Sequence, residues 1–215
     1  MQGDVIIIGD EHRAAADAII AHLIDEILAS SRRFTMTVAG ESGSGKSETG
    51  QALADALGER GVKAVVLQQD DYYVLPPKSN DAARRANFAW VGVTEVRLDL
   101  LSAHLEAAQS GQRTIVKPLV VYSENRIDEE DVSFEGAQVV IAEGVYTSLC
   151  SHVDRRVFID RNRLETMEHR VKRGREGFDP FIEKVLTKEH EIISQHRQRA
   201  DVIITRDYDV EFTEA

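Results

Sequence analysis

The 215-residue sequence predicts an α/β fold with a doubly wound, mostly parallel sheet. Two observations support it. Short β-branched runs alternate with longer stretches of helical periodicity, which is the pattern of strands joined by crossover helices. A glycine-rich segment at residues 40–45 also separates one such run from the next helical stretch. At this length we expect a main domain over residues 34–215, preceded by a strand–helix extension over residues 1–33.

The predicted strands are the β-branched runs at residues 5–8, 34–39, 64–68, 113–116, 138–142, 156–159 and 202–205. Apolar stripes at helical spacing predict helices at residues 16–27, 98–108 and 181–193. Asp179 is the expected N-cap of the last helix and Pro180 its first residue.

Two segments interrupt this alternation. Residues 70–92 are polar and aromatic and carry two prolines, so they predict a long functional loop rather than a linker. Residues 117–136 predict an irregular hairpin inserted before the next buried strand. Both fall between strands, where substrate-binding insertions tend to lie.

Composition and charge argue against several classes of function. The formal net charge is −11 and no basic stripe offsets it, which argues against a nucleic-acid-binding surface. Cys150 is the single cysteine, so we expect no internal disulfide and a reducing compartment. No window approaches ~18 apolar residues, and the N-terminus lacks the features of a signal peptide. We expect a cytoplasmic protein without membrane or nucleic-acid partners, and a homo-oligomer stays open.

The segment GESGSGKSE, residues 40–48, has the spacing of a phosphate-binding P-loop. Its glycines let backbone N–H groups point at the phosphates, and the helix that follows adds the positive end of its dipole. Lys46 would reach the β- and γ-phosphates of a nucleoside triphosphate, and the Ser47 hydroxyl would ligate Mg²⁺. A P-loop NTPase fold is therefore expected. The predicted nucleotide-binding residues of this segment are Gly40, Ser42, Gly43, Ser44, Gly45, Lys46, Ser47 and Glu48.

Carboxylates follow two more of the predicted strands. Asp70 comes after the run at 64–68, and Glu143 after the run at 138–142. Carboxylates at the carboxyl ends of parallel strands can hold Mg²⁺ or accept a proton from an attacking hydroxyl. A turn or N-cap role for Asp70 and a solvated strand end for Glu143 are the alternatives. The sequence contains neither the Asn-Lys-x-Asp guanine-reading motif nor the Leu-Ser-Gly-Gly-Gln transporter signature.

An arginine-rich segment at about residues 165–178 has the character of a lid. Arg170 and Arg173 are three residues apart on a predicted helix and share a face, and Arg175 follows the break at Gly174. Such a lid would place positive charge over a transferring phosphoryl group. A solvated basic face is the plainer alternative.

The order of these motifs resembles the uridine kinase/phosphoribulokinase-like branch of P-loop kinases. The P-loop is followed by DDYY at residues 70–73, EGVY at 143–146, the arginine-rich segment and ADVIITRDYD at 200–209. The similarity extends from about residue 34 to residue 208. It implies a kinase domain over 34–215 with ATP as donor, Mg²⁺ as cofactor and a small-molecule hydroxyl as acceptor.

The resemblance also assigns roles to single residues. Asp70 matches the general base, and Tyr73 matches an aromatic residue of the acceptor pocket. Glu143 matches the acidic residue near Mg²⁺, and Arg206 lies near the segment that borders the adenine. The arginines that match the lid are Arg170, Arg173 and Arg175.

The acceptor region departs from the uridine kinase pattern. The family's aspartate and histidine after Asn-Phe are replaced by Ala89 and Trp90. The expected acceptor-binding residues are Asp70, Tyr73, Phe88, Trp90, Tyr122 and Arg126. The acceptor therefore stays open between a uridine-like nucleoside and a sugar phosphate, glycerate or pantothenate-like molecule. An ATP-dependent regulatory protein is the alternative from another class.

For the extension at 1–33 we expect an extra edge strand and a covering helix, with His12 between them. A role in acceptor binding or dimer formation is the alternative.

Overall fold

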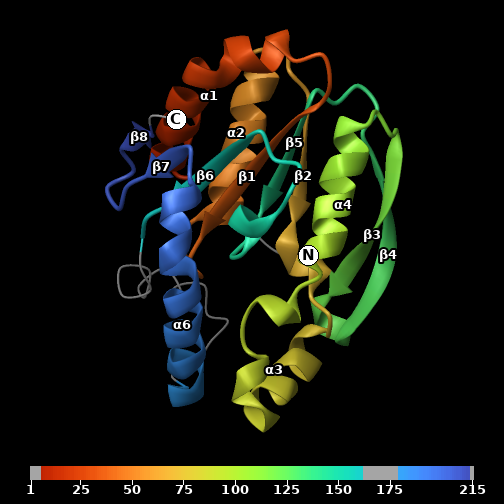
Figure 1. The fold of residues 1–215 in the computed structure, drawn as a ribbon, viewed down its shortest axis with the longest axis vertical. Helices are drawn as coiled ribbons and strands as arrows, with labels where there is room; N and C mark the ends of the chain where they lie inside the picture. The colour runs from red at the N-terminus through yellow and green to blue at the C-terminus, as the bar shows by residue number, and fades with distance from the viewer. Residues whose placement is uncertain (1–5, 162–178, 214–215) are drawn as a thin grey trace.

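The computed structural model describes residues 6–161 and 179–213 (Figure 1). It confirms the predicted α/β fold, with a mostly parallel sheet covered by helices. The predicted lid arginines Arg170, Arg173 and Arg175 lie outside the described residues. Across the two described ranges, no helix combines the length and apolar character that a membrane span requires.

The main sheet has six strands in the order β2-β5-β1-β6-β7-β8. Every neighbouring pair is parallel except β7 and β8. From β1 the chain passes to β2 at one edge, returns to β5 between β2 and β1, and then forms β6, β7 and β8 on the other side of β1, so the sheet is doubly wound. The strands are β1 (Phe34–Gly40), β2 (Ala64–Gln68), β5 (Val139–Glu143), β6 (Arg155–Ile159), β7 (Val202–Ile204) and β8 (Val210–Phe212).

The helices lie on both faces of this sheet. They are α1 (Asp10–Ala29), α2 (Lys46–Glu59), α3 (Pro77–Ala86), α4 (Leu98–Gln109) and α6 (Pro180–Ile193). Side chains of β1 alternate between two apolar cores, as the period of a strand requires. Met36 packs with α1 and α2 on one face, whereas Ala39 packs on the other face with Leu101 and Leu105 of α4.

The predicted hairpin forms a sheet of its own. β3 (Thr114–Val121) and β4 (Arg126–Ser133) pair antiparallel and do not join the main sheet. The strand predicted at 113–116 is present, but it belongs to this hairpin and not to the main sheet, because β-branched composition marks a strand but not the sheet that it joins. The hairpin is regular, with Thr114 opposite Ser133 and Val121 opposite Arg126.

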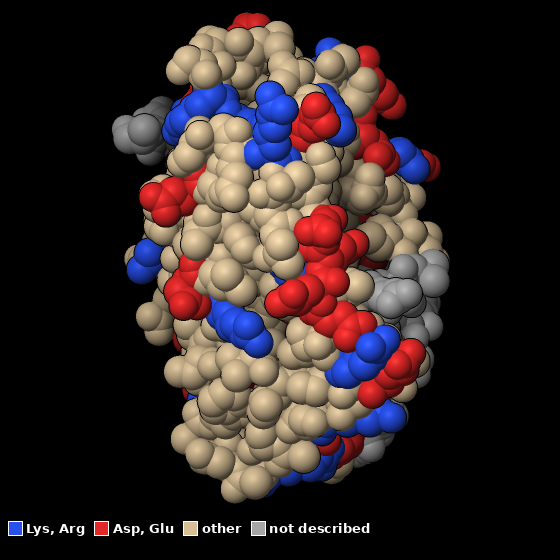
Figure 2. All heavy atoms as spheres, turned by 90° about the vertical axis from the view of Figure 1, so that its right-hand side faces the viewer, with Lys and Arg blue, Asp and Glu red and all other residues tan. Residues whose placement is uncertain are grey.

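The hairpin lies on the right of Figure 1, and Figure 2 views the molecule from that side. Acidic side chains gather in the middle of this face. The sequence of β4 contributes a run of acidic residues at 128–131. A negative surface of this kind repels polyanions.

Three other local predictions differ from the structure. Residues 70–92 are not one long loop, because α3 lies within them. Residues 6–8 form no strand, and α1 begins at Asp10. Residues 210–212 form β8, which the sequence analysis did not predict.

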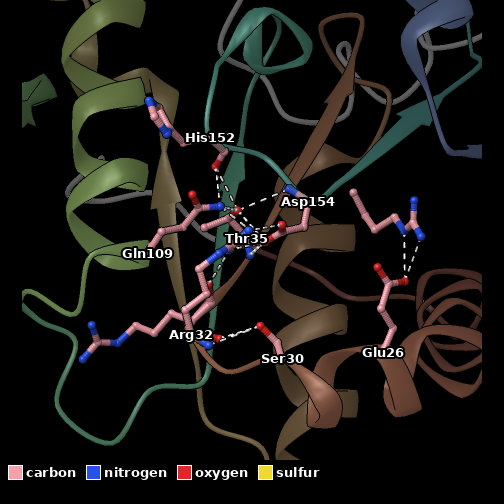
Figure 3. Close-up of polar contacts among 9 residues, drawn as sticks. Glu26, Ser30, Arg32, Thr35, Gln109, His152 and Asp154 are labelled. Atoms are coloured by element: carbon pink, nitrogen blue, oxygen red, sulfur yellow. Dashed lines mark hydrogen bonds and ion pairs between the residues drawn. The ribbon is translucent and has the colours of Figure 1, made fainter.

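The extension packs as part of the same core. α1 lies against α2, and its buried residues include Ile19, Ile20 and Leu23. The segment between α1 and β1 is fixed by Arg32, which bonds both carboxylate oxygens of Asp154 at 2.6 and 2.9 Å (Figure 3).

Asp154 connects this segment to the start of β1. Its Oδ2 accepts hydrogen bonds from the backbone N–H and the hydroxyl of Thr35, at 2.9 and 3.0 Å (Figure 3). Partial burial opposes ionisation, but the bonds from Arg32 and Thr35 outweigh it and lower the pKa of Asp154. Gln109 of α4 donates to Thr35 Oγ1 at 2.8 Å, so α4 joins the same network.

Candidate active site

The carboxyl ends of three parallel strands meet at one edge of the sheet. Val38 of β1 lies beside Glu143 of β5, which lies beside Gln68 of β2. The P-loop leaves β1 at Gly40 and Asp70 follows β2, so these features flank the Glu143 carboxylate.

A cleft of about 540 Å³ opens at this edge, a size that suits a small-molecule site. The described part of its lining includes predicted residues from the nucleotide, metal and acceptor sets. These are Ser42, Gly43, Lys46, Ser47, Asp70, Tyr73, Tyr122 and Glu143.

The P-loop backbone adopts conformations that favour glycine. Gly43 and Gly45 have φ values of 78° and 96°, in the left-handed region where a Cβ atom is unfavourable. A Cβ on Gly40 would lie 2.7 Å from Ser44 Oγ, so this position also excludes a larger residue. Within the described residues, the buried Ser44 Oγ has no hydrogen-bond partner. The loop thus keeps a polar atom available for a ligand.

Lys46 and Ser47 begin α2 and are held in the cleft by short contacts. Lys46 Nζ donates to the backbone carbonyl of Glu41 at 2.8 Å. Ser47 Oγ donates to Glu143 Oε1 at 2.9 Å. The hydroxyl and the carboxylate therefore already lie together, and both are oxygen ligands of the kind that Mg²⁺ prefers.

Glu143 lies in an environment that disfavours its charge. Burial, followed by the neighbouring Asp70 carboxylate, raises the pKa of Glu143 to about 7, against the opposing effects of Lys46 and the Ser47 hydrogen bond. A cation bound between these oxygens would reverse this effect by stabilising the carboxylate.

Asp70 lies in the short 3₁₀ helix Gln69–Tyr72 that follows β2. Its neighbour Asp71 is buried and bonds to the hairpin, accepting from Lys117 Nζ at 2.7 Å and from the Val120 backbone N–H at 2.9 Å. Asp70 is exposed and lines the cleft. The two adjacent aspartates thus have different environments, and Asp71 fixes the position of Asp70.

Two further contacts hold this 3₁₀ helix. Gln69 Oε1 accepts the backbone N–H of Tyr146 at 2.7 Å. The Tyr72 hydroxyl hydrogen-bonds His104 Nδ1 of α4 at 2.8 Å. The 3₁₀ helix is therefore hydrogen-bonded to β3, to α4 and to the turn after β5.

The acceptor side of the cleft lies between α3 and α6, which project beyond the sheet (Figure 1). Arg84 of α3 bonds to the buried Glu95 and donates to Glu189 of α6 at 3.3 Å. Sequence reasoning missed all three residues. The signal that could have found them is the pair Arg84-Arg85 in a segment already expected to be functional.

Two predicted acceptor residues line this side. Tyr73 is partly buried, and Tyr122 at the turn of the hairpin is 47% exposed. Burial, followed by the Asp70 carboxylate, raises the pKa of Tyr73, so its hydroxyl stays protonated. A direct role for either tyrosine in acceptor binding stays a prediction.

Phe88 and Trp90 are not in the described lining of the cleft. Phe88 is exposed and meets the edge of the Phe181 ring, with 6.1 Å between centroids. Trp90 donates its indole N–H to Asn80 Oδ1 at 2.8 Å. Asn80 lines the cleft, so Trp90 contacts a residue of the cleft lining without being part of that lining itself.

Arg126 also lies outside the described lining. At the start of β4 it pairs with Glu124 at 2.8 Å and Asp128 at 2.9 Å, both on the surface. The structure therefore does not bring this arginine together with the other predicted acceptor residues.

Arg206 lies between β7 and β8 and is exposed, with its Nε 3.5 Å from Asp207. Its predicted place beside the adenine stays a prediction. The same holds for Arg170, Arg173 and Arg175, which fall outside the described residues.

The extension contacts the P-loop from the side of α1. The backbone N–H of Gly9 donates to His12 Nδ1 at 3.1 Å, so the other ring nitrogen, Nε2, carries the proton. Nε2 lies 3.0 Å from the Tyr208 hydroxyl. A Cβ on Gly45 would come within 2.8 Å of His12 Nε2. His12 and Tyr208 thus pack directly on the P-loop.

Comparison with known proteins identifies the family. A profile of the Phosphoribulokinase / Uridine kinase family matches residues 35–212. The chain belongs to this family. The match includes the P-loop, both strand-end carboxylates and the DDYY segment, so the resemblance inferred from the sequence is confirmed.

Proteins similar to this chain differ in the acceptors that their names give. The bifunctional alpha-galactosidase/sucrose kinase AgaSK of Mediterraneibacter gnavus is 28% identical over 189 residues, 81% of this chain. This chain spans only 20% of that protein. The uridine kinase of Bacillus cereus (strain B4264) is 28% identical over 179 residues, 78% of this chain and 82% of that enzyme.

A solved structure shows the shared fold. D-glycerate 3-kinase from Cryptococcus neoformans superposes with a TM-score of 0.61 at 13% identity. The match covers 95% of this chain and 100% of that chain. With its family established, the chain is a small-molecule phosphotransferase that acts on hydroxyl groups.

Proposed function

We propose that this chain transfers the γ-phosphoryl group of ATP, bound with Mg²⁺, to a hydroxyl of a small molecule. The observation that carries the proposal is that Lys46, Ser47, Glu143 and Asp70 line one cleft. Groups for the donor and a base for the acceptor therefore face the same space, as in-line phosphoryl transfer requires.

The residues present fit both ATP and Mg²⁺. The glycines at positive φ and the unpartnered Ser44 hydroxyl suit a loop that wraps phosphate oxygens. Ser47 and Glu143 would hold the cation, because their oxygens already lie 2.9 Å apart. When bound, Mg²⁺ would supply charge neutralisation to the phosphates.

Asp70 is the group best placed to act on the acceptor. It is exposed in the cleft, its backbone is fixed by the buried Asp71, and it follows the strand next to Glu143. In the proposed step the Asp70 carboxylate takes the proton of the acceptor hydroxyl. The acceptor oxygen bonds to the γ-phosphorus, the bond from that phosphorus to the bridging oxygen breaks, and ADP leaves.

Lys46 would change partners during this cycle. Its ammonium donates to the Glu41 carbonyl in the described structure. With nucleotide present, the same group would reach the β- and γ-phosphates and stabilise the charge that develops on them. Arg170 and Arg173 are proposed to add positive charge that stabilises the transferring phosphoryl group.

The first test is Asp70→Asn, assayed by ADP release with Mg-ATP and a panel of hydroxyl compounds. We expect ATP binding to be retained, because Asp70 does not lie in the P-loop. Transfer should fall by a factor on the order of 10²–10⁴, the usual contribution of a general base. The matched control is Asp99→Asn, which removes an exposed carboxylate that does not line the cleft.

Transfer by Asp70→Asn at the wild-type rate would remove Asp70 from this role. ATP binding without stimulation by any hydroxyl compound, together with a protein partner captured only in the presence of ATP, would support the regulatory alternative instead.

A further inference from the structure

The acceptor end of the cleft holds an arginine and a glutamate side by side. Arg84 Nη2 on α3 donates to Glu189 Oε1 on α6 at 3.3 Å, and both residues line the cleft. Their side chains are 18% and 9% exposed, so both are largely withdrawn from water. The pair bridges the two helices that project on either side of the cleft (Figure 1).

Arg84 is held in place by an ion pair with Glu95, whose side chain is fully buried. Glu95 Oε2 accepts from Arg84 Nε and from Asn80 Nδ2, and Oε1 accepts the backbone N–H of Gly92 at 2.6 Å. Both oxygens of Glu95 therefore accept hydrogen bonds from within the protein. Asn80 also lines the cleft, but its amide already bonds Glu95 and Trp90. Arg84 and Glu189 are the charged members of this network that line the cleft.

Both arginines described at this end of the cleft are already paired with carboxylates. Arg85 lines the cleft and bonds Asp81 at 2.8 Å and Asp179 at 2.6 Å. Arg84 bonds Glu95 and Glu189, of which Glu189 also lines the cleft. A phosphate or carboxylate placed at Arg84 would therefore lie beside the Glu189 carboxylate, and the two like charges would repel.

We propose, building on the kinase function above, that the acceptor is an uncharged molecule that presents a second hydroxyl to the Arg84–Glu189 pair. A hydroxyl both donates and accepts hydrogen bonds, so it can donate to Glu189 while it accepts from Arg84. An anionic group only accepts, and it would lie against the Glu189 carboxylate.

Two kinds of compound carry this chemistry, a free sugar or polyol and the ribose of a nucleoside. Aromatic rings of Tyr73, Tyr122 and Phe181 line the same end of the cleft. Ring faces can pack against the apolar side of either compound. The arms of the experiment distinguish the two sources.

The test compares matched pairs of acceptors that differ by one anionic group. The pairs are fructose and fructose 6-phosphate, ribose and ribose 5-phosphate, glycerol and glycerate, and uridine and orotidine. Mg-ATP turnover is measured for each with the full chain. We compare the two members of the pair that contains the acceptor with the highest kcat/KM. The uncharged member should have a kcat/KM at least ~10-fold higher, because the anionic member places a like charge close to Glu189.

Glu189→Gln keeps the shape of the side chain and removes its charge. We expect this variant to lower kcat/KM for the uncharged acceptor by about 10-fold or more, because a hydrogen bond to a charged group is lost. The ratio of kcat/KM between the uncharged and the anionic member of the pair should fall by about the same factor. The KM for ATP should not change, which separates this effect from general damage. Glu191→Gln, on the exposed side of the same helix, is the matched control and should change neither quantity.

A higher kcat/KM for the anionic member of the compared pair overturns this inference and leaves the kinase function standing. An unchanged preference in folded Glu189→Gln removes Glu189 from acceptor recognition. If Glu189→Gln does not fold, the wild-type pairs still decide the charge of the acceptor. If none of the eight compounds stimulates ATP turnover although ATP binds, the result contradicts both this inference and the proposed kinase function.

Discussion

Glu143 shows how a single residue can couple metal binding to proton binding. Its carboxylate is buried beside Asp70, and its pKa is raised to about 7, so near neutral pH it holds its proton part of the time. Metal ligation requires the ionised form. Binding of Mg-ATP should therefore release protons from this site and strengthen as the pH rises through 7.

The same shift makes a prediction about stability without nucleotide. The folded state holds the Glu143 proton more tightly than the unfolded chain, where the pKa is 4.5. The contribution of this group is therefore fully present below pH 4.5 and is lost as the pH rises through 7. Integrated over that range, the free energy of unfolding should fall by on the order of 3 kcal/mol from this residue.

Glu143→Gln is the variant that checks it. Thermal unfolding of both proteins, without nucleotide, is followed between pH 4.5 and 8. The difference in stability between variant and wild type should shift in favour of the variant as the pH rises. A difference that stays constant over this range would contradict the raised pKa.

At the scale of residues, the sequence located the P-loop and both strand-end carboxylates, because their positions follow from motif spacing and strand ends. It did not distinguish the environments of Asp70 and Asp71. The burial of Asp71 depends on Lys117, which is 46 residues further along and on another sheet. The contact between Arg84 and Glu189 was not predicted for the same reason, because 105 residues separate them in the sequence.

At the scale of elements, α1 and α3 differ in what their sequences reveal. α1 carries an apolar stripe, and its buried residues line the core against α2. α3 has Asn80 as its only buried residue among those described, so no apolar periodicity marks it. Pro77 at its first turn was the available signal, but Pro76 beside it favoured a loop. Periodicity finds helices that contribute to a core and misses those held by polar contacts.

The burial of α1 leads to a matched pair of substitutions on one helix. Ile20 is fully buried, whereas Leu28 is 57% exposed. Ile20→Ala should lower the free energy of unfolding by about 2–5 kcal/mol, because it leaves a cavity between α1 and the sheet. Leu28→Ala should change it by less than about 0.5 kcal/mol. Urea unfolding measures both, and equal effects would contradict the packing of α1.

At the scale of the whole molecule, a buried ion pair links the hairpin sheet to the 3₁₀ helix that follows β2. Lys117 on β3 bonds Asp71 at 2.7 Å and Glu130 at 2.8 Å, and its side chain is 6% exposed. Because Asp71 adjoins the proposed base, the hairpin and the active-site edge are held in a fixed relation.

Lys117→Met tests this link. Removing one partner of a buried ion pair leaves the other charge buried and unpaired, so we expect the free energy of unfolding to fall by about 3–5 kcal/mol. Arg126→Met breaks exposed pairs in the same hairpin and should cost at most about 1 kcal/mol. Urea titrations compare them, and a cost for Lys117→Met as small as that of the control would show that the pair does not hold the hairpin to the 3₁₀ helix.

The sequence predicted most of the elements in their order along the chain, because the patterns that mark a strand or a helix are local in the sequence. It could not assign the strand at 113–116 to the hairpin sheet, since that choice depends on contacts made far along the chain. The helix expected to cover the domain from the extension is α1, which packs in the main core. The sequence did not predict that His12 contacts the P-loop, because this contact depends on how α1 packs.

That last contact bears on how the protein should be cut for expression. The family profile begins at residue 35, which invites a clone that starts there. Such a fragment would lack α1 and leave the apolar side chains of α2, Leu53 and Leu57 among them, facing solvent. Uncovered patches of this kind cause aggregation. A boundary chosen by family likeness would thus cut through the core, which includes α1 and has Ile8 packed against it.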